Sequence, residues 1–171
     1  VKADGYLFAQ ADDLFIQSAG GLSINNADAV REIKLSAEDD ITISADLIAN
    51  LAISAKAGAI ETTEETNLIA NKIDLNAEKN IHLNGEMKAL ELNVEAETIV
   101  SEADLLAINA LAINAKKEAI FKNSAIGATN ADIKTIELEI LNASFNAPTL
   151  SIETEKTLIE NATIEVNDLT F

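Results

Sequence analysis

The chain has 171 residues and a formal net charge of −17, from 29 acidic and 12 basic side chains. Binding to nucleic-acid phosphates or to an anionic membrane surface needs clustered lysine and arginine, and Arg31 is the single arginine, so the composition argues against both partners. The lack of cysteine excludes disulfides and cysteine-based zinc sites, and no long apolar run predicts membrane insertion.

The segment Val1–Phe15 is interpreted as an N-terminal cap. Asp4-Gly5 is a turn signal, and Tyr6, Leu7 and Phe8 follow it with apolar side chains. A solenoid end exposes unpaired backbone groups, which natural solenoids usually cover. We therefore expect this segment to fold over the first turn of a repeat that begins at Leu14.

From Leu14 onward, an apolar-x-apolar-x-small strand motif recurs. Its clearest copies are Ile33–Ala37, Leu51–Ala55, Ile73–Ala77, Leu90–Val94 and Leu111–Ala115, and weaker copies begin at Leu14, Ile133 and Pro148. The copies are about 19 residues apart on average, a period typical of solenoids. Within each copy, apolar and polar residues alternate as in a half-buried strand.

Two further short strands follow each copy. The second set begins at Leu22, Ile41, Ile60, Ile81, Ile99, Ile120, Ile140 and Leu158. The third set is centred on Leu47, Leu68, Met87, Leu105, Ile126, Phe145 and Ile164. Together these strands predict an all-β, right-handed parallel β-helix with three short strands per rung and about eight rungs, roughly 40 Å long.

The whole chain, residues 1–171, is predicted to be one solenoid domain. The segment Ile164–Phe171 alternates like an ordinary strand to the last residue, so we expect the coil to continue in a longer chain or in an axial neighbour. One helical alternative remains for Ala103–Ala119, where Leu105, Leu106, Ile108 and Leu111 have roughly helical spacing.

Acidic clusters are the first candidate sites. They are Glu38-Asp39-Asp40, Glu64-Glu65 and the pair Glu95 and Glu97. Calcium takes six to eight oxygen ligands, but the chain has neither the glycine-rich nonapeptide of calcium-loaded β-rolls nor EF-hand spacing. We interpret the clusters as solvated corners and expect no metal site.

Two carboxylate pairs resemble the acid pairs of glycosidases. Asp74 and Glu91 are expected in one outward column of adjacent rungs, and Glu137 and Glu139 on one face of a single strand. Neither pair has aromatic sugar platforms nearby, and the single histidine, His82, is expected to point to solvent. We therefore predict no catalytic residue, no cofactor and no enzymatic activity.

Asparagine is frequent just after apolar strand residues. Examples are Asn76, Asn109, Asn114, Asn142, Asn146 and Asn161, each followed by alanine. Asparagine tolerates left-handed turns, and its amide can bond to an equivalent residue in the next rung. We interpret these residues as corner formers and ladders, although Asn142 and Asn161 also fit the N-glycosylation acceptor pattern.

The segments Ile33–Ala45 and Ile73–Gly85 resemble the repeats of filamentous-haemagglutinin-type exoproteins. That family includes two-partner-secreted adhesins and contact-dependent inhibition toxins with a β-helical stalk. The resemblance implies a non-catalytic rod in a bacterial secreted or surface protein, with an extracellular or cell-surface location and with protein partners.

Two alternative functions remain open. Strands eight or nine residues apart, as at Ile33 and Ile41, are similar to the spikes of type VI secretion and phage baseplates, in which three chains intertwine into one β-prism. A self-assembling extracellular filament, stacked end to end, is the other alternative, because open ladder ends favour heterologous association.

Overall fold

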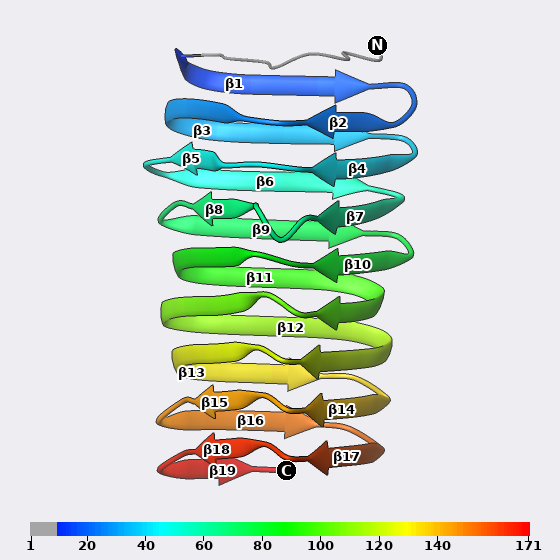
Figure 1. Cartoon of the computed structure of the whole chain (residues 1–171), viewed down its shortest axis with the longest axis vertical. Coiled ribbons are helices and arrows are strands. Elements are labelled where there is room, and N and C mark those ends of the chain that lie inside the picture. The colour runs from blue at the N-terminus through cyan, green and yellow to red at the C-terminus, as the bar shows by residue number, and fades with distance from the viewer. Residues whose placement is uncertain (1–9) are drawn as a thin grey trace.

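The computed structural model describes residues 10–171, and this part of the chain is a parallel β-solenoid of about eight turns (Figure 1). Most of the predicted cap, residues 1–9, lies outside the described residues, whereas Gln10–Phe15 belong to the first strand. The strands are β1 (Gln10–Ser18), β2 (Leu22–Ile24), β3 (Ala27–Ala37), β4 (Asp40–Ile43), β5 (Leu47–Ala49), β6 (Ala52–Ala57), β7 (Ala59–Thr62), β8 (Asn67–Ile69), β9 (Lys72–Ala77), β10 (Asn80–Leu83), β11 (Glu86–Ser101), β12 (Asp104–Lys122), β13 (Ala125–Lys134), β14 (Glu137–Leu141), β15 (Ser144–Asn146), β16 (Thr149–Glu153), β17 (Lys156–Glu160), β18 (Thr163–Glu165) and β19 (Asp168–Thr170).

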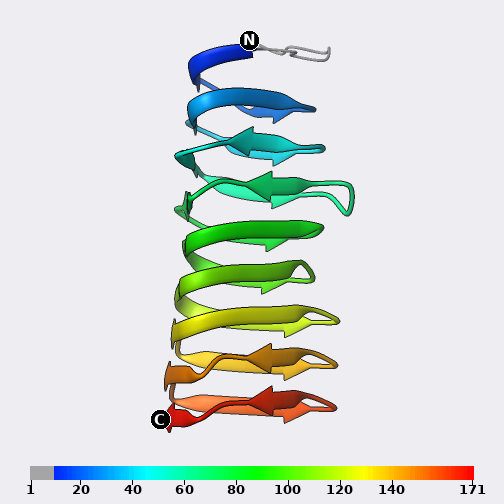
Figure 2. The same ribbon diagram turned by 90° about the vertical axis from the view of Figure 1, so that its left-hand side faces the viewer.

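Each turn of the coil has three faces, here called A, B and C in chain order. Face A contains β5, β8, β15 and β18, face B contains β6, β9, β16 and β19, and face C contains β2, β4, β7, β10, β14 and β17. The long strands β1, β3, β11, β12 and β13 run around one or two corners without a break. Figure 2 shows the turns stacked along one axis, with the loop between β7 and β8 extending beyond its neighbours.

The register on face B shows that the repeat is more regular than the sequence motif indicates. The aligned positions, which are nearly equally spaced along the chain, are Leu14, Ile33, Ile53, Ile73, Leu92, Leu111, Ala131, Leu150 and Leu169. The predicted motif starts at Leu51, Leu90, Ile133 and Pro148 are therefore wrong by two residues. The side chain of Leu90 is 37% exposed, whereas that of Leu92 is fully buried.

Faces A and C agree with the sequence to different extents. On face A, the column Leu47, Leu68, Met87, Leu105, Ile126, Phe145 and Ile164 is in register throughout, as predicted. On face C, the first five predicted residues are aligned, but the next aligned positions are Ala119, Leu138 and Thr157. The assignments to Ile120, Ile140 and Leu158 are therefore displaced by one or two residues.

The helical alternative for Ala103–Ala119 is wrong, because this segment lies almost entirely within strand β12. Leu105 and Leu111 are buried, whereas Leu106 and Ile108 are exposed. This distribution follows the two-residue period of a strand within each face. Residues 10–171 contain no helix that could span a membrane.

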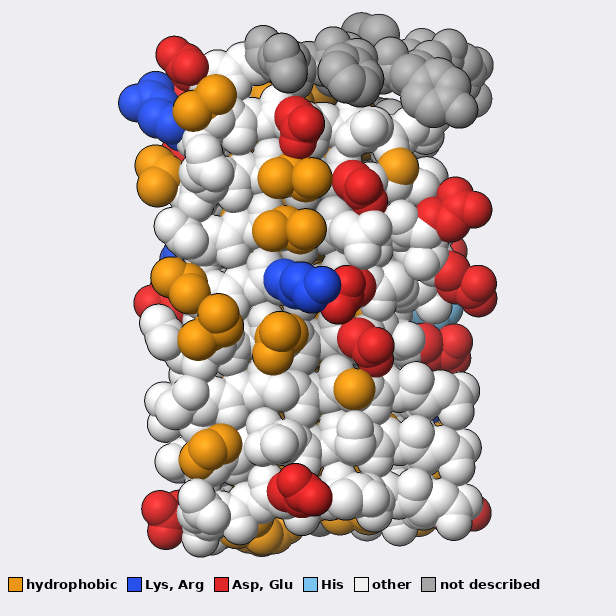
Figure 3. All heavy atoms as spheres, turned by 60° about the vertical axis from the view of Figure 1, so that its left-hand side comes forward, with side chains coloured by type: hydrophobic (Ala, Val, Ile, Leu, Met, Phe, Trp, Pro, Cys, Tyr) orange, Lys and Arg blue, Asp and Glu red, His pale blue; other side chains and the backbone are white. Residues whose placement is uncertain are grey.

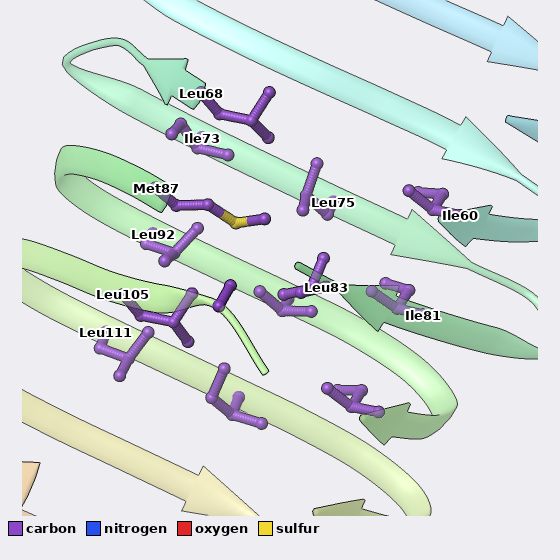
Figure 4. Close-up of a cluster of buried hydrophobic side chains, with 14 of the residues drawn as sticks. Ile60, Leu68, Ile73, Leu75, Ile81, Leu83, Met87, Leu92, Leu105 and Leu111 are labelled. Atoms are coloured by element: carbon purple, nitrogen blue, oxygen red, sulfur yellow. The ribbon is translucent and has the colours of Figure 1, made fainter. Parts of the chain in front are cut away.

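The core is a narrow column of aliphatic side chains. Figure 4 shows Leu68, Met87 and Leu105 of face A projecting into the interior beside Ile73 and Leu92 of face B. Leu75 and Ile113 are buried, as predicted. In the lower turns, the rings of Phe121 and Phe145 pack edge to face, with centroids 5.2 Å apart. Large rings are few because each wall contributes only a thin layer of side chains.

The register of face B differs by two residues from the one expected from the sequence motif, and substitutions at Leu90 and Leu92 distinguish the two registers. Leu92→Ala is expected to lower the free energy of unfolding by about 2–5 kcal/mol, because it leaves a cavity in the core. Leu90→Ala is expected to change it by about 1 kcal/mol or less, because the side chain is partly in solvent already. Urea unfolding followed by circular dichroism measures both. A larger loss for Leu90→Ala than for Leu92→Ala would restore the register expected from the sequence motif.

Candidate functional site

The carboxylates of Asp74 and Glu91 do not form a pair. In the register of face B, Asp74 lies opposite Asn93, and Glu91 lies opposite Lys72. The expectation that both acids share one column is wrong, because it depended on the misplaced strand start at Leu90.

Asp74 is instead held by two neighbours. Lys72 Nζ lies 2.9 Å from Asp74 Oδ2, and Asn93 Nδ2 donates a hydrogen bond of 2.7 Å to Asp74 Oδ1. The hydrogen bond to Asp74 and the negative charge of this carboxylate raise the pKa of Lys72. Both carboxylate oxygens of Asp74 are therefore occupied by neighbours on face B, and neither contacts a second acid.

Glu137 and Glu139 lie on the same face of β14, on either side of buried Leu138, as predicted. Glu137 accepts a hydrogen bond from the ammonium group of Lys156 in the next turn. Glu139 lies between Ile120 and Leu158 of the adjacent strands. The two carboxylates therefore have unlike partners, one a cation and the other apolar side chains.

His82 is exposed on face C, as predicted, between Glu61 and Val100 of the neighbouring turns. Within residues 10–171, no group of three or more histidine, cysteine, aspartate or glutamate side chains is placed to hold a metal ion. In the predicted acidic corner, Glu97 pairs with Lys117, whose Nζ lies 2.8 Å away. The hydrogen bond from Lys117, followed by its charge, lowers the pKa of Glu97.

Asparagines form corners as predicted, at Asn142 and Asn161, where φ is 51° and 50°. Asn123 adopts the same left-handed conformation with φ of 48°. In the sequence, Asn123 is as far from Asn142 as Asn142 is from Asn161. This equal spacing is the signal in the sequence that identifies Asn123 as a third corner. The amide groups of Asn76 and Asn93 donate to the acidic side chains of Glu95 and Asp74, not to other asparagines. The expected asparagine ladders are therefore replaced here by mixed amide and carboxylate pairs.

Exposed apolar side chains follow the edge between faces A and B, and this feature was not predicted. We call it the edge stripe: Val30, Ile48, Leu51, Ile69, Leu90, Leu106 and Ile108. Their exposed fractions range from 37% to 57%. On face A, Ile48, Ile69, Lys88 and Leu106 follow one another in adjacent turns. Figure 3 shows this side of the molecule, with apolar side chains aligned along the coil axis.

The edge stripe borders an open groove of about 320 Å³, whose lining includes Ile69, Leu90, Leu106 and Ile108. The small side chains of Ala49, Ala70 and Ala89 also line it, which explains why the surface is hollow there. At Asn50 the groove meets a second hollow, of about 460 Å³, lined in part by Asp28 and Val30. The edge is therefore concave over several successive turns.

An acidic row runs beside the edge stripe on face A. We define it as Asp46, Glu86 and Asp104. These acids lie two residues before Ile48, Lys88 and Leu106, respectively. Asp46 accepts a hydrogen bond of 2.7 Å from Asn67 Nδ2, and Asp104 accepts one of 2.8 Å from the backbone N–H of Ala125. Glu86 pairs with Lys88 at 2.8 Å. Among the described residues, Asp46 and Asp104 form no salt bridge.

Sequence doublets are the signal that identifies the stripe. Leu47-Ile48, Leu68-Ile69 and Leu105-Leu106 each place a large apolar residue directly after an inward leucine. In a strand, adjacent side chains point to opposite faces, so the second residue of each doublet must point outward. Three such doublets at equivalent positions predict an apolar outer surface.

Comparisons with known proteins add no family or function to this geometry. No protein-family model, no curated protein and no solved structure matches the chain. The β-solenoid architecture and the surfaces described above are therefore the observations on which a functional proposal has to rest.

Proposed function

We propose that this chain is a non-catalytic structural rod: a β-helical segment of a bacterial secreted or cell-surface exoprotein of the filamentous-haemagglutinin type. Such a segment holds an adhesive or toxic element away from the cell. The observation that carries the proposal is the unbroken ladder from β1 to β19, in which every turn pairs in parallel with the next. Eight turns separated by about 4.8 Å extend roughly 40 Å along the coil axis.

The single-chain topology supports this proposal over the intertwined trimeric spike. Strands of faces A, B and C in one turn come from one continuous segment, as in β11, which contributes to all three. A β-prism shares each layer among three chains, so its strands pair across chains. The described residues instead pair with the preceding and following turns of their own chain.

The oligomeric state tests the architecture of the proposed rod. Light scattering is expected to give a monomer of 18.2 kDa, and small-angle scattering an elongated particle. A stable mass three times larger would overturn the proposal in favour of the spike. A mass that grows with protein concentration would instead favour the filament of stacked subunits.

The cellular location tests the proposed role. Antibodies raised against the chain are expected to label intact cells of its source organism, or to detect the protein in the culture medium. Labelling only after permeabilisation would contradict a secreted or surface rod, whatever the oligomeric state.

A further inference from the structure

We propose that the edge stripe and the acidic row together form a docking site for a cationic amphipathic helix of a partner protein. This inference goes beyond the rod function because it assigns a binding surface to one edge of the coil. Three observations carry it: the arrangement of the backbone hydrogen bonds, the spacing of the apolar side chains, and the charge beside them.

The backbone arrangement excludes strand addition at this edge. Strands on face A pair with the turns above and below them, for example β8 with both β5 and β11. Their N–H and C=O groups are directed along the coil axis, not outward from the edge. An occupant of the groove therefore binds through side chains, as a helix does when its apolar face lies in a groove.

The spacing of the stripe fits a helix laid along the coil axis. Neighbouring turns of the coil are about 4.8 Å apart, whereas successive turns of an α-helix are about 5.4 Å apart. The difference of about 0.6 Å per turn accumulates to roughly 2.4 Å over four intervals, which is less than the width of a side chain. Four helical turns, about 15 residues and roughly 22 Å long, therefore match the stripe from Val30 to Ile108, and a helix of about 18 residues covers it with one residue or two to spare at each end.

The acids beside the groove favour a basic occupant, and the one charged residue that lines it, Lys88, is already paired with Glu86. Asp46 and Asp104 lie beside the stripe without a salt-bridge partner among the described residues, on a chain whose net charge is −17. Lysine or arginine on the polar margin of a docked helix would pair with this row. A second copy related by a twofold axis across the coil would instead bring two acidic rows together, and such contact is unfavourable.

A binding titration with two designed peptides tests the proposal. The probe is an amphipathic helical peptide of about 18 residues made of leucine and lysine, and its counterpart has glutamate in place of lysine. At about 0.15 M salt, the leucine–lysine peptide is expected to bind with one-to-one stoichiometry, and the leucine–glutamate peptide is expected not to bind. Equal binding of both peptides, or binding of neither, would overturn the proposal.

Variants of the full chain separate groove binding from general charge attraction. Leu106→Ser/Ile108→Ser removes part of the stripe, and Asp46→Asn/Asp104→Asn neutralises the two acids of the row that have no salt bridge, while each asparagine keeps a carbonyl oxygen as hydrogen-bond acceptor. Each is expected to weaken binding of the leucine–lysine peptide about tenfold or more. The control Glu61→Gln/Glu78→Gln removes two exposed charges on face C and at its corner with face B, and is expected to change the affinity less than about twofold. Equal weakening by this control would refute a specific site.

Sedimentation of the same variants tests the competing occupant. If the unmodified chain dimerises and Leu106→Ser/Ile108→Ser makes it monomeric, the stripe binds a second copy, and the proposal fails. Circular dichroism melting is expected to be nearly unchanged in all variants, because the substituted side chains are exposed or partly exposed. The conservative pair Asp46→Asn/Asp104→Asn keeps the test valid if the serine pair does not fold.

Discussion

Leu75→Asp is expected to unfold the coil, or to lower its free energy of unfolding by about 5 kcal/mol or more. Leu75 is buried on face B, stacked between Ala55 of one turn and Val94 of the next. An introduced carboxylate would meet apolar neighbours there without a hydrogen-bond donor, and the lost leucine adds a cavity. Because small domains are stable by only about 5–15 kcal/mol, one such change is comparable with the whole stability. Thermal and urea unfolding, followed by circular dichroism, measure the loss.

Two further positions on face B complete this experiment: Ile113 is a second inward position, and Ala112 is an outward control. Ile113→Asp is expected to behave like Leu75→Asp, since Ile113 is equally buried and aligned with Leu75 through Val94. Ala112→Asp places the same charge on the outward side, opposite Asn93 and Asp132, and is expected to cost about 1 kcal/mol or less. If both inward variants melt like the unmodified chain, the inward assignment of face B is wrong.

Gly85→Ala is expected to lower the free energy of unfolding by about 2–4 kcal/mol. Gly85 has φ of +84°, and an added Cβ would lie 2.2 Å from the carbonyl oxygen of Thr66. A left-handed conformation costs a non-glycine residue about 1–3 kcal/mol, and the collision with backbone adds to that cost. The corner cannot relax easily, because Thr66 O also accepts a hydrogen bond of 2.9 Å from the backbone N–H of Glu86. Thermal unfolding followed by circular dichroism measures the change.

Gly20→Ala is the matched control for Gly85→Ala. A Cβ at Gly20 meets its nearest neighbour, Asp39 Oδ2, at the ordinary contact distance of 3.7 Å. This substitution is expected to change stability by about 1 kcal/mol or less, in either direction, because it also restricts the unfolded chain. Equal melting temperatures for the two variants would show that the corner at Gly85 rearranges around a methyl group.

The alternation of apolar and polar residues specifies which side chains point inward, but it does not specify which residues pair between turns. A slip of two residues on face B keeps every side chain on its original side, so Leu90 and Leu92 fit the apolar pattern equally well. On face A the turns contain short strands such as Leu47–Ala49, which leave less room for such a slip. The sequence therefore predicts face A correctly and misplaces two clear copies on face B. The predicted pairing of Asp74 with Glu91 fails for the same reason.

The edge stripe was missed for a different reason. Ile48 and Ile69 add nothing to the inward columns, because each follows a leucine that already fills the core. Their alignment depends on the lengths of the corners between the turns, and the apolar pattern alone does not determine these lengths. Corner geometry, as at Asn123 and Gly85, depends on backbone conformation and is equally hard to derive from alternation.

The three left-handed corners at Asn123, Asn142 and Asn161 give the lower turns one backbone length and one corner conformation. Each corner lies just before the face A strand of its turn, and the same length of chain separates each corner from the next. Duplicating or deleting one whole unit between two of these corners would leave every remaining pairing in register. The backbone pairing of these turns is therefore compatible with a change of length in steps of one turn, whereas the core residues differ between turns, as Ala131 and Leu150 do at one position of face B.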